Sequence, residues 1–129
     1  MVYDINSIAR HAARNSDFET HMWYAYYIIS EDQSNQEEKD AYRITIGNIV
    51  KAATYFEFDT KKISDLKLSS FVLIMDRIHD KFAKTLDDFT AYTGFFRLCL
   101  EILMENNLID TNPMTQIIAD PIYYSKYWP

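Results

Sequence analysis

Apolar residues recur with the spacing of an α-helix along four stretches of this chain, at about residues 17–30, 35–56, 70–82 and 86–106. Intervals of three and four residues place such side chains on one helix face, which a globular protein buries against its neighbours. The residues expected to face inward are Phe18, Met22, Ala25, Tyr26 and Ile29; Tyr42, Ile46, Ile49, Val50 and Ala53; Phe71, Ile74, Met75, Ile78 and Phe82; and Phe89, Tyr92, Phe96, Cys99, Leu100 and Leu103. With a shorter pattern at residues 5–14, the spacing predicts an all-α fold of four to five helices.

The scarcity of turn residues supports this interpretation, because the 129 residues include 2 Gly and 3 Pro. Sheets and sandwiches need many turns, and turns favour these residue types. Polar residues that cap helix N-termini stand at the expected boundaries. They are Ser16 with Glu19, Ser34 with Glu37, Ser69 or Ser70, and Thr85 with Asp88.

The segment LMENNLIDTNPM, residues 103–114, has the composition of a helix end. Asparagine tolerates the left-handed conformation that often terminates a helix, so we expect a positive φ at Asn106 or Asn107. The turn would then carry Leu108 and Ile109 back onto the helix, where we expect both to be buried. Pro113 is expected to prevent the helix from resuming and to hold the chain extended.

These boundaries predict one helical domain at residues 1–114, in which residues 1–16 form an N-terminal arm or short helix, followed by an irregular aromatic tail or linker at 115–129. The tail is expected to pack on its own core, to dock on a partner protein, or to belong to a larger protein. Aromatic side chains are enriched at protein interfaces, so a partner would be met by the last aromatic residues of the chain. These are Tyr123, Tyr124, Tyr127 and Trp128.

Charge and cysteine content restrict the function classes. The chain has 13 Lys and Arg against 19 Asp and Glu, a formal net charge of −6. Nucleic-acid-binding domains are usually basic, so the total argues against DNA, although a local distribution of charge can override it. The single cysteine, Cys99, allows no internal disulfide and favours a reducing, cytoplasmic setting. Because no signal peptide and no apolar run of 18 residues is present, we expect no membrane span.

No motif predicts catalysis, a metal or a cofactor. Asp76, His79 and Asp80 have a spacing that can present metal ligands on one helix face, but no further His or Cys completes a site, and a surface cluster is the preferred interpretation. His11 and His21 show no partner spacing. A nucleophile motif and a glycine-rich phosphate loop are both absent from the sequence. We therefore expect a protein that is not an enzyme and needs no cofactor.

The order of these parts resembles the core-binding (SAM-like, N-terminal) domain of tyrosine recombinases, the phage-integrase group. The resemblance covers about residues 17–114 and is carried by the ending from Phe95-Phe96-Arg97 to Asn112-Pro113 and by "ISDL" at 63–66. It implies an orthogonal helical bundle that forms one half of a clamp around duplex DNA and grips it with the second and fourth long helices. It also implies a role in DNA integration and recombination by a mobile element. The Arg-His-Arg-Tyr catalytic domain of the family is not part of this sequence.

The resemblance suggests which residues contact DNA. They are Lys39, Arg43 and Lys51 on the second long helix, and Lys84, Thr85 and Arg97 at and along the fourth. Three lysines of the connecting segment, Lys61, Lys62 and Lys67, are weaker candidates. Each set is also compatible with an ordinary solvated surface.

An alternative function follows from the acidic character. Asp87 and Asp88 stand where the family usually has polar or basic residues, and a carboxylate beside a phosphate is unfavourable. The chain could therefore be a phage or mobile-element protein that binds another protein, as an acidic regulator, an antagonist or a DNA mimic. Both hypotheses remain open from the sequence.

Overall fold

The computed structural model describes residues 16–31 and 35–129. These residues form six α-helices and no strand, which confirms the all-α expectation. The helices are α2 (Phe18–Glu31), α3 (Gln36–Tyr55), α4 (Leu68–Lys81), α5 (Leu86–Glu105), α6 (Pro113–Ala119) and α7 (Pro121–Tyr127), with a short 3-10 turn, η1, at Ile63–Asp65. The helix expected at 5–14 lies outside the described residues.

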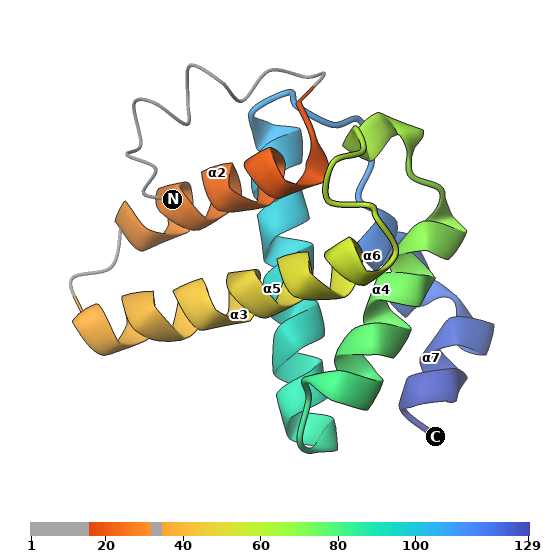
Figure 1. The fold of residues 1–129 in the computed structure, drawn as a ribbon. Coiled ribbons are helices and arrows are strands. Elements are labelled where there is room, and N and C mark those ends of the chain that lie inside the picture. Colours follow the sequence, from red (N-terminus) through yellow and green to blue (C-terminus); the bar gives the residue numbers. More distant parts are fainter. Residues whose placement is uncertain (1–15, 32–34) are drawn as a thin grey trace.

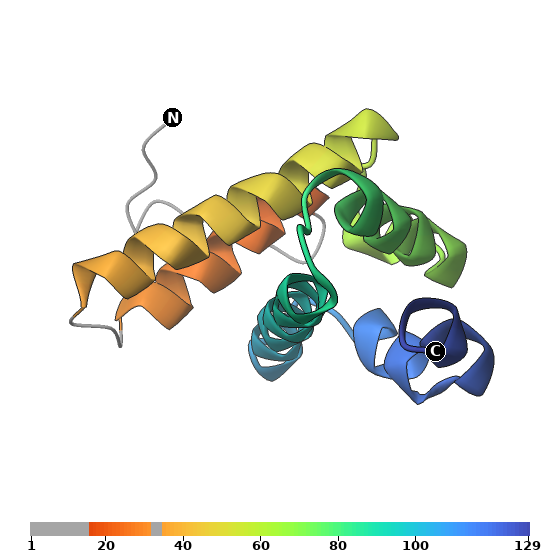
Figure 2. The same ribbon diagram turned by 90° about the horizontal axis from the view of Figure 1, so that it is seen from below.

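α2 and α3 lie side by side and antiparallel (Figure 1). α3 crosses α5 near its middle (Figure 1). On the other side of α5, α4 packs beside the short helices α6 and α7 (Figure 2). The N-terminal halves of α3 and α5 therefore point away from their crossing in different directions (Figure 1).

The core is built from the predicted faces of the four long helices. Phe18, Phe71 and Phe96 meet at its centre, with ring centroids 6.0–6.4 Å apart. Of the expected inward residues, Ile29, Tyr42 and Phe82 are half-buried and the others are buried. These aromatic contacts each add to the stabilisation from apolar burial.

Two further buried side chains carry polar groups. Cys99 is fully buried, as expected, and burial raises the pKa of its thiol. His21 is also fully buried, although no feature of the sequence placed it in the core.

The caps of α2 and α3 lie one residue later than expected. Asp17, not Ser16, caps α2, with its carboxylate accepting from the Thr20 N–H at 2.8 Å. Asn35 caps α3 and accepts from two backbone N–H groups at 2.8 and 3.3 Å; Ser34, the expected cap, lies outside the described residues. Asp and Asn cap helices at least as well as Ser, so a neighbouring Ser is a weak guide to the first residue.

The start of α4 also differs from the prediction, whereas that of α5 agrees. Lys67 precedes α4, and neither Ser69 nor Ser70 is the capping residue. The Ser70 hydroxyl lies in the first turn and accepts from the Lys67 N–H at 3.2 Å. Thr85 caps α5 as expected, accepting from the Asp88 N–H at 3.1 Å.

The end of α5 confirms the predicted turn. Asn107 has a φ of 60°, and the N–H groups of Asn107 and Leu108 donate back to the carbonyls of Met104 and Leu103 at 3.0 and 2.9 Å. This is the Schellman arrangement that satisfies the last helical carbonyls. Leu108 and Ile109 are half-buried against the core rather than fully buried. Both line a cleft of about 340 Å³ beside η1 and the start of α4.

The expectation that Pro113 keeps the chain extended is wrong. Pro113 is the first residue of α6, and the Asn112 side chain caps this helix by accepting from the N–H groups of Met114 and Thr115 at 3.0 and 3.3 Å. The first turn of a helix tolerates proline because its N–H positions have no helical acceptor. The Asn-Pro pair is therefore a helix start.

The expectation that the tail is irregular is wrong for the same reason: a capping residue followed by proline starts a helix there too. Asp120 caps α7 by accepting from the Ile122 N–H at 2.9 Å, and Pro121 is the first residue of that helix. Ile117 of α6 and Tyr127 of α7 belong to the common core. The segment at 115–129 is thus largely helical and packs on the rest of the protein.

Asn112 also joins α6 to α5. Its side-chain amide donates to the Arg97 carbonyl at 3.0 Å and to the Glu101 carboxylate at 3.3 Å. Since Asn112 is 5% exposed, these groups would meet little water if the side chain were removed. One carboxamide therefore makes four hydrogen bonds that fix where α6 begins and join it to α5.

We expect Asn112→Ala to lower the free energy of unfolding by about 2–4 kcal/mol, because it removes a cap and leaves buried groups unsatisfied. Asn112→Ser retains a capping oxygen but cannot reach Arg97, so it should recover about 1 kcal/mol of that loss. Urea unfolding of the three proteins measures both differences. A loss below about 0.5 kcal/mol for the alanine variant would contradict a stabilising role for these four bonds.

Candidate nucleic-acid interface

A groove of about 700 Å³ runs between the N-terminal halves of α3 and α5, and we call it the α3–α5 groove. Its floor is mainly aromatic and aliphatic. Tyr42 and Phe95 stack across it, with ring centroids 5.0 Å apart and ring planes 15° from parallel. The Asn48 side chain donates to the Tyr92 hydroxyl at 2.8 Å. These contacts fix the floor, while Ile44 at its edge remains 60% exposed.

Two of the expected DNA contacts border this groove. Lys84 and Thr85 lie in the loop between α4 and α5 and line its rim. The Asp88 carboxylate accepts from the Lys84 N–H at 2.9 Å. Asp87 and Asp88 also lie in the first turn of α5, where the helix dipole favours carboxylates. These acidic residues thus have a structural role at the position where the resemblance suggested polar or basic ones.

The other edge of α3 carries Lys39 and Arg43. Five positions separate Arg43 from Asn48, which places them about 140° apart around the helix. Arg43 pairs with Asp40 at 3.6 Å, and Lys39 is half-buried. This pair consequently does not share the groove with Lys84.

Arg97 also lies away from the groove. It is nine positions after Asp88, or about 180° around α5. The Arg97 carbonyl accepts from Asn112 on the side of the helix that α6 covers, and the side chain is exposed. Among the six residues suggested by the resemblance, Lys84 and Thr85 are brought together at the groove.

Lys51 continues the groove-facing stripe of α3. It lies three residues after Asn48 and is exposed, and Tyr55 follows it by four residues on the same stripe. The Arg77 guanidinium of α4 covers the Tyr55 ring, with its carbon 3.7 Å from the ring centroid. The contact brings a cation of α4 next to the cation-bearing stripe of α3.

The sequence interpretation missed Arg77 and Lys81. They lie four residues apart on α4, and Lys81 is exposed. Lys51 of α3 and Lys84, which lines the groove, are two further cations on the neighbouring segments, and we call these four residues the basic surface. Two like charges four residues apart on one helix are mildly destabilising. A pair that is present despite this cost could have pointed to a role in binding an anion.

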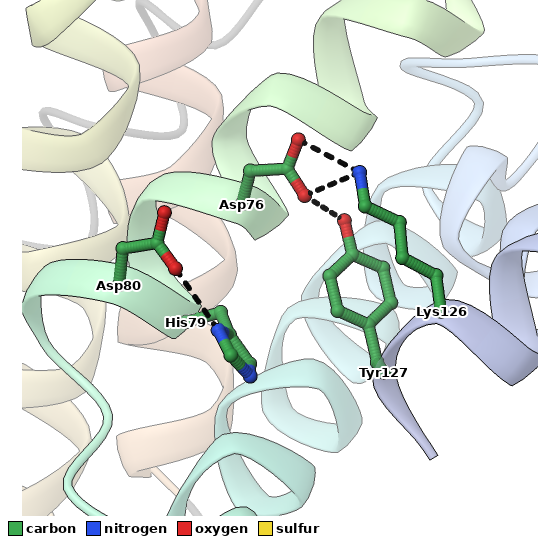
Figure 3. Close-up of polar contacts among 5 residues, drawn as sticks. All are labelled: Asp76, His79, Asp80, Lys126 and Tyr127. Carbon is green, nitrogen blue, oxygen red and sulfur yellow. Dashed lines mark hydrogen bonds and ion pairs between the residues drawn. The ribbon is translucent and has the colours of Figure 1, made fainter. Parts of the chain in front are cut away.

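The flank of α4 that carries Asp76 faces α7 (Figure 3). The Asp76 carboxylate pairs with Lys126 at 2.9 Å and accepts a short hydrogen bond from the Tyr127 hydroxyl. His79 and Asp80 contact each other at 3.0 Å. Within the described residues no group of three His, Cys, Asp or Glu side chains is placed to hold a metal ion.

The tail aromatics pack on the protein itself, which was the first of the three expectations. Tyr127 and Trp128 contact Phe89, with ring centroids 5.1 and 5.4 Å away. The Trp128 indole N–H donates to the Thr90 hydroxyl at 2.8 Å. Tyr127 is buried, Tyr123 and Trp128 are half-buried, and Tyr124 is 47% exposed.

The remaining candidate lysines are separate from the groove. Lys61, Lys62 and Lys67 are exposed in the connection between α3 and α4, and the Lys61 carbonyl accepts from the Phe18 N–H at 2.8 Å. This contact is between main-chain groups and leaves the lysine side chain outside. In the part of the chain that the structure describes, no helix is long and apolar enough to cross a bilayer.

Tyr127→Phe should test the contact between α7 and α4. Burial, followed by the hydrogen bond to Asp76, raises the pKa of Tyr127 above its ordinary value of 10.0. The folded protein thus holds this proton more tightly than the unfolded chain does, so the stabilisation is present below about pH 10 and is lost as the pH rises further.

We expect the phenylalanine variant to be about 1–2 kcal/mol less stable at pH 8, measured by urea unfolding. The difference should shrink above pH 10, because Tyr127 of the unfolded wild type then ionises and favours unfolding, whereas the variant has no such group. Tyr124→Phe, on the exposed side of α7, is the control and should show neither effect. A difference that stays constant with pH would show that the hydroxyl does not determine the stability of this contact.

Comparison with protein-family models, curated proteins and solved structures finds no match to this chain. The functional assignment therefore depends on the geometry of the α3–α5 groove and the basic surface. Both features are formed by α3, α5 and the end of α4, whose positions are set by the common core.

Proposed function

We propose that this chain is a non-catalytic module that binds duplex DNA, similar to the core-binding domain of tyrosine recombinases, and that it acts in the cytoplasm. The observation that carries the proposal is the joint position of α3 and α5. These are the second and fourth long helices, which the family resemblance expects at DNA, and they border one open groove. The proposal gives the chain no catalytic residue and no cofactor.

The distribution of cations supports this proposal. The basic surface takes its four cations from α3, from α4 and from the loop that follows α4. Phosphate contacts of this kind supply most non-specific affinity for DNA, and local charge can outweigh an unfavourable total. Acidic residues such as Glu37 and Asp87 lie in first helical turns, where they stabilise helices.

The groove supplies the means to contact bases. Thr45, Asn48 and Thr85 provide polar groups along it, and Ile44 and Ala91 provide exposed apolar ones. Apolar side chains can contact thymine methyl groups in a major groove, and Asn can pair with adenine. In this arrangement the basic surface positions the duplex and the groove edges meet the bases.

A salt titration tests the proposal and distinguishes the two edges of α3. Binding of a fluorescent duplex should weaken steeply with salt, and the slope of log K against log salt changes by about 0.9 for each phosphate contact. Lys51→Ala with Lys84→Ala should reduce the slope by about two. Lys39→Ala with Arg43→Ala is the charge-matched control and should leave it nearly unchanged, because that pair lies on the other side of α3.

Two results would overturn the proposal. One is the absence of measurable binding to any duplex at low salt, with the protein shown to be folded by circular dichroism. The other is an equal effect of the two double variants, which would indicate diffuse attraction and no defined interface.

A second candidate function is favoured by the apolar floor of the groove. Exposed Ile44 and the stacked Tyr42 and Phe95 resemble the lining of grooves that accept the apolar face of a helix from another protein. In this alternative the chain is an acidic regulator or antagonist from a phage or mobile element. Nuclease-treated pull-downs should then recover one protein partner, and Ile44→Glu should abolish its recovery. Loss of all bound material after nuclease treatment would favour DNA instead.

A further inference from the structure

We propose that Tyr55 and Arg77 form a stacking site for an unpaired nucleobase, with Lys51 and Lys81 contacting the phosphates that adjoin it. This inference rests on the proposed function and names the form of nucleic acid that the basic surface prefers. The preferred ligand is a duplex that carries a single-stranded extension or an unpaired nucleotide.

Tyr55 is an aromatic side chain that the core does not use. It is the last residue of α3 and is 62% exposed, whereas most of the described aromatic residues are buried or half-buried. Its ring meets the Phe56 ring edge to face, with centroids 5.0 Å apart. An exposed aromatic ring on a rigid element offers a flat apolar surface that a base can cover.

The position of the Tyr55 ring is fixed from two sides. Arg77 covers the ring at 3.7 Å, a cation–π distance that orients both groups. Directly after Tyr55 the chain reverses in a turn where Glu57 has a φ of 62° and Phe58 donates its N–H to the Ala53 carbonyl at 3.0 Å. A non-glycine residue in this conformation is uncommon, and the turn ends α3 directly beyond the ring.

The flanking cations lie one helical turn from the stacked pair. Lys51 precedes Tyr55 by four residues on α3, and Lys81 follows Arg77 by four residues on α4. Both lysines are exposed. The close spacing of Arg77 and Lys81 costs a little stability in the free protein, and a phosphate between or beside them would reverse that cost.

The nearby acidic residues of α4 are directed elsewhere. Asp76 contacts Lys126 and Tyr127 of α7, and Asp80 contacts His79 (Figure 3). The carboxylates of Asp76 and Asp80 are thus engaged by groups other than Arg77 and Lys81. A ligand at Tyr55 would accordingly meet a flat ring, a guanidinium and two ammonium groups.

These chemical features fit an unpaired nucleotide better than a paired one. Base pairs in a duplex present their edges to a protein, and their flat faces are covered by stacked neighbours. An unpaired base exposes its face, and both tyrosine rings and arginine guanidinium planes are common surfaces for it. The phosphates that adjoin the base supply the negative charge that Lys51 and Lys81 would bind.

Fluorescence anisotropy with two DNA molecules tests the inference. One is a blunt duplex, and the other is the same duplex with a short single-stranded extension. We expect the extension to increase affinity by about fivefold or more, which is the lower range for stacking of one base. Tyr55→Leu should remove this increase and leave binding of the blunt duplex nearly unchanged, whereas Tyr55→Trp should retain it.

Tyr124→Leu is the matched control, because Tyr124 is an exposed tyrosine on α7, away from the basic surface. A 2-aminopurine placed in the extension provides a second measurement, since its fluorescence should be quenched by wild type and not by Tyr55→Leu. Circular dichroism should show that both leucine variants remain folded.

The outcomes separate this inference from the proposed function. If both DNA molecules bind equally, or if Tyr55→Leu weakens both to the same extent, the stacking site is wrong and duplex binding stands. If neither DNA binds the folded protein at low salt, both proposals are overturned.

Discussion

The hydrogen bonds of Asn112 determine how the C-terminal part of the chain joins the rest. Its oxygen starts α6, and its nitrogen holds that start against α5 at Arg97 and Glu101. α6 leads directly into α7, whose Tyr127 reaches Asp76 of α4. Both short helices consequently lie on one side of α5. The α3–α5 groove on its other side stays uncovered, so this one buried side chain indirectly decides which surface is available.

Helical periodicity predicted α2, α3, α4 and α5 with their buried faces, because those helices bury one continuous stripe each. It failed after Leu108. Pro113 was expected to keep the chain extended and the tail to be irregular, whereas Asn112-Pro113 and Asp120-Pro121 are each a cap followed by a first-turn proline. Only the sequence pattern after each proline could tell a helix start from an irregular segment. Helices of seven residues are too short to show a clear apolar period there.

The site was less predictable than the fold, since it depends on how helices are rotated against one another. Lys84 and Thr85 were chosen through the family resemblance and do line the groove, whereas Arg97 lies on the side of α5 that α6 approaches. The apolar stripe of α4 predicts which face is buried, but it does not reveal that Arg77 meets the end of α3. An aromatic residue such as Tyr55 is usually assigned to the core, and its exposure follows from the place where α3 ends.

The formal charge of −6 does not describe how charged side chains are distributed over this fold. Several carboxylates serve the fold itself, as first-turn residues of α3 and α5 or, for Asp76, as the anchor of α7. Charges used in this way are partly neutralised by helix dipoles and by Lys126. The cations of the basic surface instead lie beside exposed tyrosine and an apolar groove. Under the proposed function a nucleic acid would meet all three, because it carries flat bases and regularly spaced negative charge.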